Sequence, residues 1–180
     1  KLFWGRFRWN YSKNRRRIKK SKIKKKFSSK LSEMIKKKLP FELTNSQEKV
    51  LEQINIDLKS ETRMFRILQG DVGSGKTIVA LLSMANVFES GYQCAFMAPT
   101  DILARQHYEL AKKVFLNTEI NIDFLSGKID TKKRKNILEK LEKGQINILI
   151  GTHSLFQKKI KFNKLGLSII DEQHKFGVKQ

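Results

Sequence analysis

Residues 70–77 carry the stretch Gly70-Asp71-Val72-Gly73-Ser74-Gly75-Lys76-Thr77, which fits the pattern G-x-x-x-x-G-K-[ST]. In such a loop the backbone N–H groups surround phosphate oxygens, the Lys76 ammonium balances the terminal phosphates, and the Thr77 hydroxyl is a ligand for Mg²⁺. In a chain of this composition a chance match is expected on the order of once in a hundred sequences. The loop therefore predicts a nucleotide site formed by all eight residues.

A second motif follows about a hundred residues later, where the apolar run 167–170 ends in Asp171 and Glu172. A carboxylate after a buried strand can complete the coordination of a Mg²⁺ begun by Thr77, and a neighbouring one can deprotonate an attacking water. An acidic pair alone is more typical of an exposed turn, but the phosphate loop reverses that preference. We expect Asp171 to hold Mg²⁺, Glu172 to act as the base, and both motifs to meet around one ion, as in a nucleotide-driven motor.

Strand-like and helix-like segments alternate between and around these motifs. A helix capped by Thr44 or Asn45 is expected first, and apolar periodicity then places the remaining elements. The expected strands are 64–68, 93–98, 121–125, 146–150 and 167–170, and the expected helices are 77–88, 102–115 and 131–141. Alternation of this kind predicts an α/β domain with a mainly parallel sheet and helices on both faces.

Small, hydroxyl or charged residues follow each of the five expected strands. These groups are 70–77, 99–100, 126–127, 151–153 and 171–174. Each is an ordinary turn by itself, but ligands of open parallel sheets gather at the carboxyl ends of the strands. We therefore expect the five groups to lie at one edge of the sheet.

Other polar side chains are open to two interpretations. Gln47, with Phe41 nearby, fits recognition of adenine through its amide, although a glutamine on a helix is more often simply solvated. The three histidines share no metal-ligand spacing, and one cysteine excludes a disulfide framework and disfavours zinc. His153 and His174 are expected to couple the sites or lie at the polar edge, and His107 is equally well explained as an exposed helical residue.

Charge is distributed unevenly over the 180 residues, whose net charge is +21. Residues 1–40 hold seventeen Lys and Arg but one acid, Glu33, and so account for +16. We expect residues 1–38 to form a partly disordered basic arm that binds polyanions or, equally, serves as a solvated linker. Aromatic residues among the bases at 3–11 stack on nucleic-acid bases or belong to a packed element.

Location is predicted from what the sequence lacks. It has no apolar run of membrane-spanning length and no secretory signal, and its single cysteine suits a reducing compartment. We expect a cytoplasmic protein with no membrane partner, an organellar transit peptide being a minor alternative. Because the chain begins at Lys1 rather than Met, we expect it to be a piece of a longer protein.

Six stretches, in order, resemble the first motor domain of the RecG family of bacterial ATP-dependent DNA helicases. The resemblance covers residues 39–180, and Gln173 with the Leu39-Pro40-Phe41 entry favours this family over the transcription-repair coupling factor and the primosomal helicase. The stretches are 39–44, 68–77, 97–100, 103–107, 150–157 and 171–178. Asp101 and Arg105 depart from the family pattern and are expected to be surface variation.

The resemblance implies a RecA-like P-loop NTPase domain of a superfamily-two translocase that uses ATP and Mg²⁺ on branched duplex DNA in replication restart, recombination and repair. It also implies that a set of residues faces the DNA backbone, namely Thr100, Gln106, Ser126, Gly127, Thr152 and His153. We expect residues 39–180 to be a first motor domain truncated at its C-terminal side. The wedge domain, the second motor domain and its arginine finger are not in this sequence, so slow turnover is expected of the chain alone.

Two other classes of function are consistent with parts of the sequence. One is a non-catalytic basic module that binds nucleic acid through the arm, and the other is a P-loop ATPase that acts on protein. DNA binding unaffected by Lys76→Ala would support the first. Absence of stimulation by DNA would support the second.

Overall fold

The computed structural model describes residues 25–127, 129–157 and 160–172. It divides into two compact units, Lys1–Asn86 and Val87–Gln180, which are described in turn. Most of the predicted basic arm lies outside the described residues, as do Gln173 and His174. Among the helices of the described ranges, none has both the length and the apolar character needed to span a membrane.

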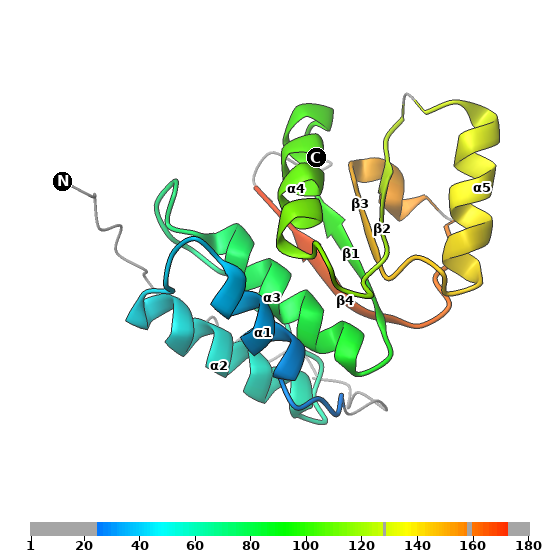
Figure 1. The fold of residues 1–180 in the computed structure, drawn as a ribbon. Helices are drawn as coiled ribbons and strands as arrows, with labels where there is room; N and C mark the ends of the chain where they lie inside the picture. Colours follow the sequence, from blue (N-terminus) through cyan, green and yellow to red (C-terminus); the bar gives the residue numbers. More distant parts are fainter. Residues whose placement is uncertain (1–24, 128, 158–159, 173–180) are drawn as a thin grey trace, which may run out of the picture. The chain divides into compact units, whose positions relative to one another are not determined.

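Helices dominate the first unit (Figure 1): α1 is Lys30–Lys38, α2 is Asn45–Lys59, and α3 begins here and runs over Lys76–Glu89. The sequence did not lead us to expect α1. Thr44 caps α2 with a capping box, since its side chain accepts from the Gln47 N–H while the Gln47 side chain accepts from the Thr44 N–H. The buried residues of α2 recur at helical spacing and include Val50, Leu51, Ile54 and Leu58.

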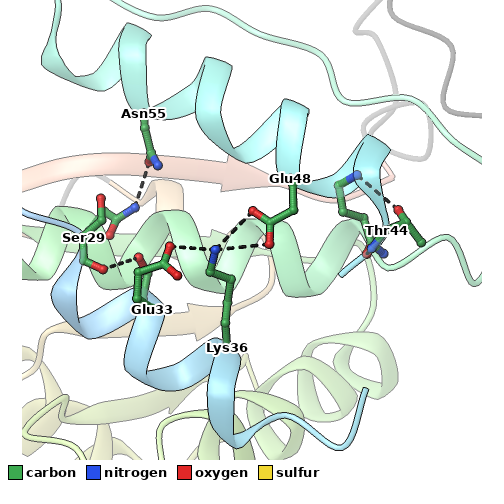
Figure 2. A network of polar contacts seen from close by, with 9 residues as sticks. Ser29, Glu33, Lys36, Thr44, Glu48 and Asn55 are labelled. Atoms are coloured by element: carbon green, nitrogen blue, oxygen red, sulfur yellow. Dashed lines mark hydrogen bonds and ion pairs between the residues drawn. The ribbon is translucent and has the colours of Figure 1, made fainter. Parts of the chain in front are cut away.

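A lysine joins α1 to α2 (Figure 2). Lys36 Nζ lies 2.6 Å from a Glu33 carboxylate oxygen and donates to both carboxylate oxygens of Glu48, at 3.2 and 3.1 Å. Burial alone lowers the pKa of Lys36, but the hydrogen bonds and charges of the two glutamates outweigh burial and raise the pKa above 10.5. The ammonium therefore stays charged and ties the two helices together.

The strand expected at 64–68 is not formed, and residues 63–71 have no regular secondary structure. Phe65 is 89% exposed and Ile67 is 56% exposed. A strand is stable only when a neighbouring strand takes up its backbone hydrogen bonds, and none of the described strands pairs with this segment. The apolar run alone was therefore insufficient to predict it.

The second unit is a parallel sheet with helices, as predicted (Figure 1). Its strands are β1 (Gln93–Met97), β2 (Ile122–Leu125), β3 (Ile148–Gly151) and β4 (Leu165–Ile170), in the order β2-β3-β1-β4. All three pairings are parallel. The connections carry α4 (Asp101–Val114), α5 (Thr131–Glu142) and the short 3₁₀ helix η1 (His153–Phe156).

Consecutive residues of β2 show that helices cover both faces of this sheet. Phe124 packs in a cluster with Ala104 of α4, whereas Leu125 packs in another cluster with Ile137 and Leu141 of α5. Because successive strand residues point to opposite faces, α4 and α5 lie on opposite sides. The central strands β1 and β3 are buried throughout, as expected for strands covered on both faces.

Candidate functional site

The glycine loop of the first unit has the backbone that its sequence requires. Gly73 and Gly75 both have φ +81°, a left-handed conformation that side-chain-bearing residues rarely adopt. The Ser74 N–H donates to the Asp71 carbonyl at 3.1 Å, which closes the turn before α3 begins at Lys76. The loop therefore ends at a helix N-terminus, where backbone N–H groups favour anions.

Two polar side chains of the loop fit a phosphate group. Lys76 Nζ donates to the carbonyl oxygens of Gly70 and Asp71, at 2.8 Å each. Ser74 Oγ is a buried atom without a hydrogen-bond partner among the described residues. Thr77 follows in the first turn of α3 and is half-buried. A cation, a hydroxyl and helix N–H groups gathered in eight residues form a donor set suited to a nucleotide's phosphates.

Gln47 contacts the phosphate loop directly. Its Oε1 accepts from the Thr44 N–H at 2.8 Å and its Nε2 donates to the Ser74 carbonyl at 2.8 Å. One N–H and one lone pair of the amide remain for the predicted adenine contact, which stays a prediction. Phe41 is 47% exposed. The contact with the loop was not predicted from the sequence, although the T-x-x-Q capping pattern indicated that Gln47 lies in the first turn of a helix.

Four strand ends of the second unit lie in one row. The register pairs Leu125 with Gly151, Gly151 with Met97, and Met97 with Ile170, which are the last residues of their strands. The predicted gathering of polar groups at one sheet edge is thus confirmed for the four strands of this unit. The Asp171–Glu172 pair follows directly at the end of this row.

Hydrogen bonds hold the backbone and both carboxylate oxygens of Asp171. Its backbone N–H donates to the Met97 carbonyl at 2.8 Å, and its Oδ1 accepts from the Glu172 N–H at 3.0 Å. Its Oδ2 lies 2.7 Å from Nε2 of His107. Glu172 has φ +49°, an unusual value for a residue with a side chain, and such strain clusters at functional sites.

His107 is buried, not exposed on its helix. Its ring stacks on Phe96 of β1 with centroids 4.7 Å apart and planes 19° apart. Ala104, His107 and Ala111 are the buried residues of α4. Their spacing places all three on one helical face, a signal that was present in the sequence and that would have identified His107 as a core-facing residue.

The six residues predicted to face DNA fall into two groups. Thr100, Gln106, Gly127 and His153 are exposed, and Thr100 caps α4 by accepting from the Leu103 N–H at 3.3 Å. Ser126 and Thr152 are buried. Nothing in the structure tests their contact with DNA, so all six remain predictions.

A divalent ion would have to share its ligands with a nucleotide. Among the residues that the structure describes, no three His, Cys, Asp or Glu side chains cluster as ligands. Mg²⁺ in phosphate sites takes one or two protein oxygens and fills the remaining positions with phosphate and water. The hydroxyl of Thr77, in the first unit, and the carboxylate of Asp171, in the second, are oxygen donors of that class, so the chemistry of each suits such an ion.

Comparison with known proteins identifies the family. Residues 44–180 match the DEAD/DEAH box helicase family. The chain belongs to that family. The match begins at the Thr44 cap and includes the phosphate loop and the acidic pair, so both halves of the predicted site lie inside the helicase domain.

Relatives of this helicase domain confirm the resemblance to RecG. The chain is 49% identical to the ATP-dependent DNA helicase RecG of Thermotoga maritima over 158 residues, and 46% identical to that of Bacillus subtilis. Each alignment covers 88% of this chain but only 20% and 23% of the relative. The chain therefore spans about a fifth of the length of the curated relatives it matches.

A solved structure described as RecG bound to a three-way DNA junction is similar in fold, with a TM-score of 0.81 and 46% identity. The match covers 88% of this chain and 22% of that chain. It confirms the α/β architecture of a helicase motor domain, and the family's use of ATP agrees with the phosphate loop.

Proposed function

We propose that this chain is the ATP-binding lobe of a RecG-type DNA helicase, which hydrolyses ATP with Mg²⁺ and moves along branched DNA in replication restart, recombination and repair. The observation that carries the proposal is the phosphate loop, whose left-handed glycines and Lys76 precede a helix N-terminus. The similarity to RecG relatives supports DNA as the track. We assign residues 39–180 to the motor lobe and residues 1–38 to a basic connector.

In this proposal the loop binds the triphosphate. Backbone N–H groups of residues 70–77 donate to phosphate oxygens, and Lys76 exchanges two neutral carbonyl partners for charged ones. The attraction between the ammonium and the negative charge of the phosphates, which the neutral carbonyls lack, favours that exchange. Gln47 steadies the loop through the Ser74 carbonyl while its free N–H and lone pair, with Phe41, contact adenine.

We assign the chemistry to the acidic pair. Thr77 and Asp171 supply oxygen ligands, directly or through water. An Mg²⁺ held there would supply positive charge to offset the negative charge that develops during phosphoryl transfer. Glu172 orients the attacking water and accepts its proton. His174, which lies outside the described residues, would couple this chemistry to movement.

In this proposal DNA binds along the polar residues that follow the aligned strand ends of the second unit. Thr100, Gln106, Gly127 and His153 are exposed, so they are accessible to the sugar-phosphate backbone. Ser126 and Thr152 are buried, and would shape the turns that carry the exposed groups. Backbone contacts position DNA without selecting a sequence, as movement along DNA requires. A second motor domain and a wedge domain would complete the machine, in the cytoplasm.

The test is ATP hydrolysis by the intact protein with and without a synthetic three-way DNA junction. We expect the junction to stimulate hydrolysis more than linear duplex of equal length, and Lys76→Ala to abolish the stimulated rate. Hydrolysis that is indifferent to DNA would contradict the DNA part of the proposal. Normal hydrolysis by Lys76→Ala would contradict the ATP site.

A further inference from the structure

We infer that His107 is a positioning residue, which holds the Asp171 carboxylate in the orientation needed to bind Mg²⁺ with the nucleotide. The inference rests on the proposed function and adds to it a residue of α4 that acts through Asp171. Its basis is the contact between the two side chains, which are 64 residues apart in sequence.

The contact is short and shielded from solvent. His107 Nε2 lies 2.7 Å from Asp171 Oδ2, and the two side chains are 11% and 27% exposed. A carboxylate only accepts hydrogen bonds, so the hydrogen of the pair is on Nε2 of the imidazole. This N–H donor fixes the position of one carboxylate oxygen. His107 would therefore affect the ion by orienting Asp171.

Packing contacts that do not involve the carboxylate hold the imidazole of His107 in place. The ring stacks on Phe96, which belongs to β1, and the residue shares its buried helical face with Ala104 and Ala111. Thr100, which follows β1 after Ala98 and Pro99, caps the first turn of α4. The position of the donor is thus set by β1 and α4, which are rigid elements of the second unit.

The carboxylate is fixed in turn from its other side. The Glu172 N–H donates to Oδ1, and the Asp171 N–H donates to the Met97 carbonyl of β1. Each carboxylate oxygen therefore has a donor within the protein, and a carboxylate offers about four lone-pair sites in all, so it can also serve an ion or its water. Removing a group that orients a metal ligand typically weakens metal binding about 10–100-fold.

Three variants separate the hydrogen bond from the shape of the side chain. His107→Gln keeps an N–H donor near the place of Nε2, whereas His107→Asn has the same amide one carbon shorter and cannot reach Oδ2. His107→Met fills a similar volume without a donor. Lys112→Ala, at an exposed position of α4, is the control for changes on that helix.

The experiment measures binding of a fluorescent, non-hydrolysable ATP analogue to the intact protein during a Mg²⁺ titration. We expect His107→Asn and His107→Met to raise the half-saturating Mg²⁺ concentration about tenfold, and His107→Gln and Lys112→Ala to leave it near the wild-type value. A thermal-unfolding cycle without nucleotide, combining His107→Met with Asp171→Asn, should show non-additive effects.

Equal Mg²⁺ midpoints for the folded Gln and Asn variants would overturn the inference. Lys76→Ala distinguishes this from failure of the proposed function. If Lys76→Ala abolishes analogue binding while the Gln and Asn variants bind Mg²⁺ alike, only the role of His107 is wrong. If Lys76→Ala binds the analogue normally, the nucleotide site itself is wrong.

Discussion

The phosphate loop and the acidic strand end hold their polar groups in different ways. Within the loop, Lys76 bonds to carbonyls five and six residues earlier, and two left-handed glycines set the turn. At the strand end, Asp171 is held by Met97 of β1 and by His107 of α4. The loop is therefore shaped mainly by its own sequence, whereas the strand end depends on the fold around it.

The largest expected effects separate the roles of the two regions. Lys76→Ala should lower both ATP affinity and turnover, because in the proposed site the ammonium contacts phosphate in the bound state as well as in the transition state. Glu172→Gln should lower kcat about a thousandfold with little change in affinity, because it removes the proposed base but keeps the shape of the side chain. Analogue binding and steady-state hydrolysis by the intact protein measure both. Near-normal hydrolysis by either variant would remove that residue from the site.

A glycine pair tests how far the loop depends on its backbone. Gly73 and Gly75 share φ +81°, so alanine at either position costs roughly 1–2 kcal/mol in strain. A Cβ at Gly73 meets open space, whereas one at Gly75 collides with Nε2 of Gln47. We expect Gly75→Ala to weaken ATP binding more than Gly73→Ala.

Adding Gln47→Ala should remove that difference, because the colliding amide is then gone. Isothermal titration of the ATP analogue against the single and double variants measures it. Equal affinities for Gly73→Ala and Gly75→Ala would mean that Gln47 does not restrain the loop.

Relieving the backbone strain at Glu172 should have a smaller effect on stability than the changes above. It should raise stability while it lowers activity. Glu172→Gly should relieve the left-handed backbone and stabilise the domain by about 1 kcal/mol while abolishing hydrolysis. Asn117→Gly is the control, because Asn117 has φ +60° and is exposed outside the site. Its activity should be unchanged. Chemical denaturation followed by hydrolysis assays checks both, and a destabilised Glu172→Gly would argue against stored strain.

The smallest expected effect concerns Lys36, far from both motifs in sequence. Its pKa is raised in the folded state, so its stabilising contribution is complete below pH 10.5 and is lost as pH rises through the folded-state value. Since Glu33 and Glu48 are 57% and 46% exposed, Lys36→Met should cost less than about 1 kcal/mol.

Lys37→Met, at an exposed position of the same helix, should cost less still. Thermal unfolding between pH 7 and about pH 11 compares the two. The difference between them should shrink at the alkaline end, and a difference that grows there would contradict the ion-pair account.

Local patterns predicted much of the fold. Helical spacing placed the face of α2 with Val50 and Ile54, and apolar runs placed β1 and β3, because these signals lie within a few residues. The segment 64–68 shows the limit, since a strand also needs a neighbour that no local pattern supplies. In the same way, the spacing of Gly, Lys and Thr in the sequence predicted a phosphate-binding loop. It did not predict the contact of that loop with Gln47.

The pairing of His107 with Asp171 was beyond prediction from the sequence for a physical reason. The spacing of Ala104, His107 and Ala111 shows that His107 faces the core, but its partner depends on the alignment of β4 with β1. That alignment brings together residues 64 positions apart, and only the folded sheet determines it.

The central claim of the proposed function is that Thr77 and Asp171 serve one Mg²⁺. The most direct measurement is a crystal structure of the intact protein with a non-hydrolysable ATP analogue and Mn²⁺, located by its anomalous scattering. The account predicts one ion peak at the nucleotide, coordinated by the Thr77 hydroxyl and by Asp171 directly or through a single water. An ion at the nucleotide with Asp171 out of reach would contradict it.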